Sequence, residues 1–201
     1  MGINSINATS FEFDFVPFAD IVEFNYVFAS EEYPEYVCTS FNDVFGFFIS
    51  GPGIPGVQNI ARIPGTNAPV AINTVNSGTP GIFGDAFDCA VQDPNWQSNS
   101  VYYTTQYATY SGQGYNGGTI SLPSEVTLQC GETYHIKIAV ANVGDEALDS
   151  GVYLEANSFV SDAVQVVVAT VTGDTTVFEG CTDASIYFIR PQSQINDTLT
   201  I

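Results

Sequence analysis

Two stretches near the start of the chain carry large apolar residues at alternate positions. In residues 10–18, SFEFDFVPF, phenylalanine alternates with acidic residues. Residues 21–30, IVEFNYVFAS, repeat the pattern with Phe24, Tyr26 and Phe28 on one face. Successive side chains of a β-strand point to opposite faces, so a period of two gives each strand one apolar and one polar face. Both stretches therefore predict half-buried strands of an antiparallel sheet.

Similar strand patterns recur in residues 43–51, DVFGFFISG, and residues 134–144, YHIKIAVANVG, and no stretch shows the 3.6-residue period of a capped helix. Residues 51–120 are rich in Gly, Pro, Asn, Ser and Tyr. Structureless loops of that length are uncommon in compact domains, so this region is expected to contain short strands with elaborate connections. The pattern predicts an all-β fold, an antiparallel two-sheet sandwich of jelly-roll type with long Gly/Pro/Tyr-rich loops.

Charge limits the partners of such a domain. The 201 residues include 22 acidic and three basic residues, for a net charge of −19. Because a buried unpaired carboxylate is very costly, the excess acids must be solvated, hydrogen-bonded or bound to a metal. A field of this sign disfavours binding to nucleic acid and to anionic membranes, and it attracts hard cations. The chain also lacks an apolar run of about 18 residues, so no direct membrane insertion is expected.

Two acidic loops are candidates for a Ca²⁺ site. Residues 29–43, ASEEYPEYVCTSFND, and residues 143–151, VGDEALDSG, concentrate oxygen ligands beside apolar strands. Ca²⁺ accepts 6 to 8 oxygen ligands in irregular geometry, and the spacing here is not that of an EF-hand. If the two loops meet at one end of a sandwich, they would supply a bound Ca²⁺ with ligands; the alternative is that both are simply solvated. The predicted ligands are Glu31, Glu32, Asn42, Asp43, Asp145 and Asp149.

Aromatic residues gather in the second half of the long connecting region. Trp96, Tyr102, Tyr103 and Tyr107 have Asn and Gln neighbours. Flat apolar rings beside amides are typical of carbohydrate sites, which makes surface glycans candidate partners. The alternative is that these rings pack on the sheet.

Sequence motifs of catalysis are missing from the chain. There is no G-x-S-x-G nucleophile elbow and no phosphate-binding glycine loop, and His135 falls on the polar side of a strand pattern. Among 22 acids, some pair will always resemble the acid and base of a glycosidase. We therefore predict a non-enzymatic domain, with a carbohydrate-active enzyme as the alternative.

Four cysteines, Cys38, Cys89, Cys130 and Cys181, are widely spaced and form no C-x-x-C pair. With a single histidine in the chain, a zinc site is not expected. Widely spaced cysteines suit an exported protein with one or two disulfides. The favoured pairings are Cys38–Cys89 or Cys89–Cys130, with Cys181 in a separate module.

Several long motifs occur in order: FEFDFVP, DIVEFNYVFASEEYPEYVCTSFNDVFGFFISGPG, NIARIPGTNAPVAINTVN, DPNWQSNSVYY and CGETYHIKIAVANVGDEALDSGVYLEANSF. Over roughly residues 5–159 the chain resembles the choice-of-anchor L domain of large secreted Bacteroidetes surface proteins. The resemblance implies a β-rich extracellular module on the bacterial cell surface, in proteins exported by the type IX route that include gliding-motility adhesins. Its partners would be surface glycans or other cell-surface protein chains.

The resemblance also bears on the boundaries of the domain. Family domains usually carry Gly-rich strands before FEFDF, so the domain is expected to be truncated at its N-terminus, with neighbouring domains or chains completing the sheet. We place the domain at residues 1–159, followed at 160–201 by a linker strand. The segment VFEGCTDASIYFIRP resembles the start of a Calx-β or Ig-like module. The leading function is an adhesion module stabilised by Ca²⁺, and the alternative is a structural spacer of a surface filament.

Overall fold

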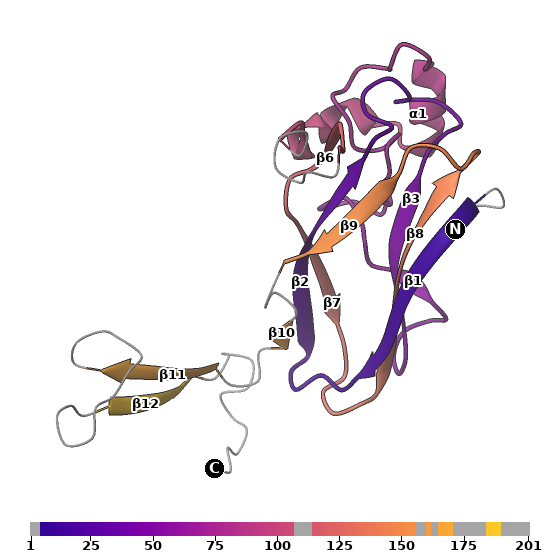
Figure 1. The fold of residues 1–201 in the computed structure, drawn as a ribbon. Helices are drawn as coiled ribbons and strands as arrows, with labels where there is room; N and C mark the ends of the chain where they lie inside the picture. The colour runs from indigo at the N-terminus through magenta and orange to yellow at the C-terminus, as the bar shows by residue number, and fades with distance from the viewer. Residues whose placement is uncertain (1–4, 107–113, 156–159, 162–164, 171–183, 190–201) are drawn as a thin grey trace.

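The computed structural model of the chain describes residues 5–106, 114–155, 160–161, 165–170 and 184–189. Two antiparallel sheets pack face to face, as Figure 1 shows. The first has the order β1-β8-β3-β4. Its strands are β1 (Ser5–Phe15), β8 (Tyr134–Val143), β3 (Val44–Ser50) and β4 (Gln58–Asn59). The prediction of an all-β sandwich is confirmed.

Strand β2 (Ile21–Ser30) is the centre of the second sheet. One edge of β2 pairs with β7 (Leu122–Thr127) and β6 (Gly117–Thr119), and β6 pairs in turn with β5 (Tyr103–Thr104). The opposite edge pairs with β9 (Ser150–Leu154) and with β10 (Val160–Ser161). This arrangement aligns the end of β2 with the start of β9, where Ser30 lies opposite Ser150.

Aromatic side chains fill the space between the two sheets. The predicted alternation in β2 directs Phe24, Tyr26 and Phe28 inward, where each is at most 2% exposed. The ring of Phe47 on β3 lies edge-on to Phe24 and to Tyr26, with centroid distances of 4.9 Å in both pairs. Edge-to-face pairs of this kind stabilise a core beyond the burial of their area.

One end of the sandwich is covered by irregular chain, which we call the crown: residues 31–43 and 71–102. It carries α1 (Ala86–Gln92) and the 3₁₀ helix η1 (Trp96–Tyr102) (Figure 1). The expectation that the chain has no capped helix is wrong here. Each helix has seven residues, too few to show a periodic stripe, but Asp85 caps α1 by accepting a hydrogen bond from the Phe87 amide.

A disulfide joins Cys38 to Cys89 and so ties the first loop of the crown to α1. This confirms one of the two favoured pairings and excludes Cys89–Cys130. Cys130 is exposed and forms no disulfide within the described part of the chain, and Cys181 lies outside it.

Strands β11 (Gln165–Thr170) and β12 (Ala184–Ile189) pair with each other in a separate two-stranded sheet. The predicted boundary between residues 159 and 160, and the assignment of residues 160–201 to a second module, stay predictions. Residues 156–159 and most of the chain after Thr170 lie outside the described residues.

Candidate functional site

The two acidic loops, far apart in sequence, meet at the crown end of the sandwich. The Glu31 amide donates to the Asp149 carbonyl at 3.0 Å, and the Asp149 amide donates to Glu31 Oε2 at 3.0 Å. The pairing of β2 with β9 sets up this contact, because it places residue 30 opposite residue 150. The convergence predicted from the sequence is therefore present in the fold.

Asp43 lies beneath this junction and is 1% exposed. Its Oδ1 accepts from the Val143 amide at 2.9 Å, and its Oδ2 accepts from Ser150 Oγ at 2.7 Å. Burial raises the pKa of Asp43; the two hydrogen bonds lower it, and the charges of Asp145 and Asp149 raise it. Asp43 thus connects the last residue of β8 and the first residue of β9 to the loop that precedes β3.

Glu32 is the anomalous member of the cluster. It is 2% exposed, and its Oε2 has no hydrogen-bond partner among the described residues. Burial, followed by the negative charges of Asp43 and Asp145, raises the pKa of Glu32 to about 8. A buried carboxylate oxygen with no donor is costly, so near neutral pH this group needs either its proton or a cation.

The other predicted ligands have partners of their own. Asn42 Oδ1 accepts from the Asn73 amide at 2.8 Å, inside the crown. Asp145 is exposed, and its Oδ1 accepts from the Ala147 amide within its own turn at 2.9 Å. Within the described part of the chain, no three His, Cys, Asp or Glu side chains are placed so that they could hold a metal ion together. Metal binding by this cluster stays a prediction, and it would require at least one carboxylate to leave its present donor.

The chemistry of the cluster nevertheless suits a hard cation. Carboxylate and hydroxyl oxygens are the ligands that Ca²⁺ prefers, and Glu32, Asp43 and Ser150 supply both types. Glu32 Oε2 is buried, negative when ionised, and has no hydrogen-bond donor among the residues that the structure describes. A cation beside it would remove the repulsion among the carboxylates.

Buried amides were not recognised in the sequence as structural residues of the crown. Asn73 Oδ1 accepts from the Cys38 amide and Asn73 Nδ2 donates to the Thr39 carbonyl, both at 2.7 Å. Asn99 Nδ2 donates to Asp93 Oδ2 and to the Thr74 carbonyl, both at 2.8 Å. Asparagines set among small apolar residues, as in NAPVAINTVN, are a signal for such amides, but their distant partners cannot be read from the sequence.

The predicted aromatic platform is dispersed in the structure. Trp96 is 3% exposed and belongs to the core. Tyr102 and Tyr103 are half-buried and pack against the core. The Tyr103 ring lies 5.1 Å from that of Tyr33, and Tyr107 lies outside the described residues. The ring of Trp96 therefore does not lie on the surface, and glycan binding at this set stays a prediction.

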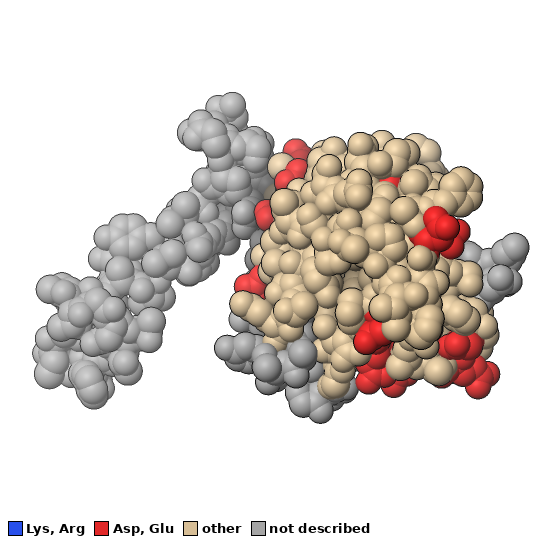
Figure 2. Space-filling view, turned by 90° about the horizontal axis from the view of Figure 1, so that it is seen from above, with Lys and Arg blue, Asp and Glu red and all other residues tan. Residues whose placement is uncertain are grey.

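Charge is unevenly distributed over the crown. Viewed from above, the described surface is largely free of acidic side chains at its centre, carries them toward its margin and shows no Lys or Arg (Figure 2). Exposed apolar side chains occur in this region, among them Phe83 and Phe87.

On the flank of the sandwich, His135 Nδ1 lies 2.8 Å from Asp14 Oδ1, and Lys137 Nζ donates to Glu12 Oε1 at 2.6 Å. His135 thus sits in a surface polar cluster, as its place on the polar side of the strand predicted.

These features define a class: an antiparallel β-sandwich domain with a disulfide-linked crown, of the kind found in exported proteins. The chain belongs to the choice-of-anchor L domain family, whose family model matches residues 1–160. Domains of this family are modules of secreted surface proteins. Searches of curated proteins and of solved structures gave no match. In the described part of the chain, no helix has the length and apolar character needed to cross a membrane.

Proposed function

We propose that this domain is a non-catalytic adhesion module of a large secreted bacterial surface protein, and that Ca²⁺ bound between its two acidic loops stabilises the crown end. The observation that carries the calcium proposal is the buried Glu32 carboxylate, whose Oε2 has no donor within the described part of the chain and which lies beside Asp43. The family membership supports the surface location. The resemblance noted above further supports export by the type IX route and a role among gliding-motility adhesins.

In the proposed site, Glu32 and Asp43 supply the buried carboxylates. The exposed Asp145, whose charge already acts on both, rotates from its turn to complete the oxygen shell. Glu32 releases its proton when the cation binds. The ion then connects the loop after β2 to the turn between β8 and β9, a contact that otherwise depends on hydrogen bonds around Glu31, Asp43 and Asp149.

Calcium titration into chelator-treated protein tests this proposal, with heat and melting temperature as readouts. At 100 times the dissociation constant, binding is expected to stabilise the fold by about 2.7 kcal/mol at a single site. Glu32→Gln is expected to abolish both signals because it removes the charge and keeps the shape. Asp88→Asn, at an exposed position of α1, is the matched control and keeps them. Absence of heat and of any melting shift in the unaltered protein would refute the calcium site.

The raised pKa of Glu32 makes a second prediction, for protein free of divalent cations. The folded state holds the Glu32 proton more tightly than the unfolded state, whose pKa is near 4.5. The resulting stabilisation is fully present below about pH 4.5 and is lost as the pH rises through about 8. Melting temperatures should fall over this range, and Glu32→Gln should flatten the slope. Asp88→Asn controls for general repulsion in this acidic chain, so equal slopes in the two variants would contradict the assignment.

Adhesion itself is tested by applying the domain to a glycan array and to surface-protein fractions, with and without Ca²⁺. Calcium-dependent retention is the expected result. If the protein binds neither cation nor surface component, it is a structural spacer in which Glu32 simply keeps its proton. Turnover of a polysaccharide panel would instead support the alternative of a carbohydrate-active enzyme.

A further inference from the structure

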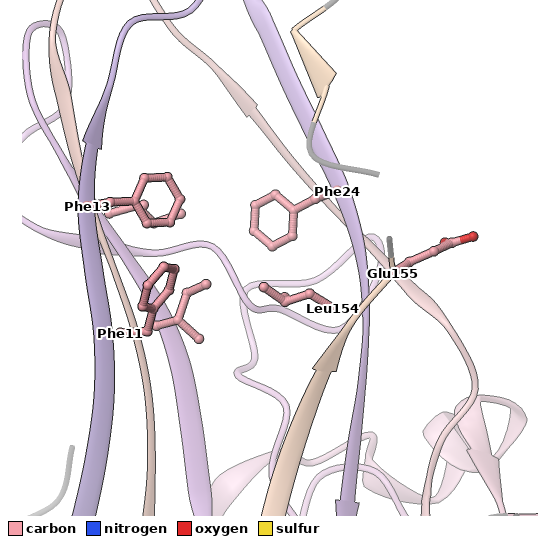
Figure 3. A pocket seen from close by; sticks show the side chains of 7 residues that line it. Phe11, Phe13, Phe24, Leu154 and Glu155 are labelled. Atoms are coloured by element: carbon pink, nitrogen blue, oxygen red, sulfur yellow. The ribbon is translucent and has the colours of Figure 1, made fainter. Parts of the chain in front are cut away.

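An apolar groove of about 290 Å³ opens along one side of the sandwich, between the two sheets. Figure 3 shows Phe11 and Phe13 of β1 on one wall, facing Phe24 of β2 and Leu154 of β9 on the other. Its floor includes Ile136 and Ile138 of β8. Phe11 is 61% exposed and Leu154 is 47% exposed, so the groove is open to solvent.

Terminal strands border this groove on both sides. Among the described residues, β1 is the terminal strand of its sheet and pairs only with β8. In the described part of the chain, strand β9 pairs with β2 alone, at the facing margin of the other sheet. β1 is 11 residues long and contains no proline. A long edge strand without proline is a template for pairing with a further strand.

The groove's size and chemistry favour a polypeptide as its occupant. About 290 Å³ falls just below the range of roughly 300–1,000 Å³ usual for drug-sized ligands, and suits one or two large side chains. An extended strand laid along β1 places every second side chain on one face, which would fill the groove between Phe11 and Leu154.

Charge indicates what kind of strand would fit. Glu155 lies at the mouth with its side chain directed away from the rings (Figure 3). Its Oε2 accepts from Asn25 Nδ2 at 2.8 Å, which fixes a negative charge there. A second copy of this chain would bring a net charge of −19 against the same charge, whereas a strand with Lys or Arg would be attracted.

We propose that the groove binds an extended segment of another protein by strand addition to β1. The segment's alternate apolar side chains enter between Phe11 and Leu154, and its Lys or Arg residues lie near Glu155. This surface is distinct from the acidic cluster, so it depends on neither Ca²⁺ nor Glu32.

The test uses an acetylated, amidated peptide of about eight residues, a common strand length, with Val and Leu alternating with Thr and a Lys at each end. Calorimetry and hydrogen exchange are measured at about 0.15 M salt, where screening over about 8 Å leaves a close contact with Glu155 in place. We expect binding, with slower exchange in residues 5–15. A version N-methylated on alternate amides should not bind, because strand addition needs main-chain hydrogen bonds.

Matched variants locate the site. Phe11→Asp and Leu154→Asp should each weaken peptide binding by about tenfold or more. The fold should not change, because Phe11 is 61% and Leu154 47% exposed. Phe87→Asp, at a phenylalanine that is 71% exposed on α1, should have no effect. Failure of the peptide to bind, equal binding of the N-methylated peptide, or an equal loss with Phe87→Asp would overturn the proposal. So would a dimer in light scattering that Phe11→Asp dissociates, since the occupant would then be a second copy.

Discussion

The sandwich and the crown are held together by different interactions. Between the sheets, aromatic rings such as Phe24, Tyr26 and Phe47 pack edge to face, and regular ladders satisfy the backbone. In the crown, one disulfide and a set of buried amides replace the ladders, with Asn73 bonded to both Cys38 and Thr39. The sandwich therefore combines apolar packing with backbone ladders, whereas the crown relies on side-chain hydrogen bonds and a disulfide.

Among single substitutions, the largest effect is expected at Phe47 in the sandwich. Phe47 is 0% exposed and contacts rings of both sheets. Phe47→Ala is expected to lower the free energy of unfolding by about 4 kcal/mol, because it leaves a cavity in the core. Urea denaturation measures the loss. Phe48→Ala, at the half-buried next position of β3, is the control and should cost clearly less. Similar losses at the two positions would mean that packing between the sheets is not what stabilises this part.

Removal of the Cys38–Cys89 disulfide tests the crown. The bridge closes a loop with a sequence separation of 51 residues. Cys38→Ser with Cys89→Ser is therefore expected to cost about 4 kcal/mol. Hydrogen exchange sharpens the comparison: amides of the crown should exchange faster in this double variant, while those of β3 and β8 stay protected longest. Cys130→Ser controls for the loss of a thiol and should change neither. Uniform loss of protection would show that crown and sandwich unfold as one unit.

A smaller effect is expected at Asn73. Asn73→Ala leaves the Cys38 amide and the Thr39 carbonyl without their partner in a buried site, at a cost of about 2 kcal/mol. Thermal denaturation gives the value. Asn67→Ala removes an exposed amide that bonds to Arg62, and should be close to neutral. If the two variants match, the buried amides contribute little to the crown.

The smallest effect is expected on the polar flank of the first sheet. Lys137 donates to Glu12 at 2.6 Å, but the two side chains are 44% and 40% exposed. Exposed ion pairs contribute little because water and salt screen them, so Lys137→Ala should leave the urea midpoint almost unchanged. A large, salt-dependent shift would show that charge pairing, not packing alone, supports the sandwich.

The strands of the sandwich were predictable from the sequence, and the crown was not. Alternation in residues 21–30 predicted the buried faces of β2, because strand periodicity is a local property of the chain. The crown offered no such period: α1 is too short, and the partners of Asn73 and Asn99 are side chains and carbonyls set by the tertiary fold. Cys38–Cys89 was one of two favoured pairings, and only the fold decided between them.

The candidate site was predicted in part. Acidic turns beside strands predicted that two loops meet at one end of the sandwich. These loops carry Glu31, Glu32, Asp43, Asp145 and Asp149. The sequence did not predict which of these carboxylates is buried. Burial depends on how the two loops pack together, and the hydrogen bond from Ser150 to Asp43 fixes that packing. For Trp96 the sequence left two alternatives open, a surface platform for sugars or packing on the sheet, and the structure places this ring in the core.

The pairing of β2 has a consequence for how this chain acquires its structure. Its described partners are β6, β7, β9 and β10, all of which begin at Gly117 or later, whereas β2 ends at Ser30. The second sheet therefore cannot assemble until most of the polypeptide is present. Topologies dominated by such distant pairings fold on the order of milliseconds to seconds, slower than those built from local contacts.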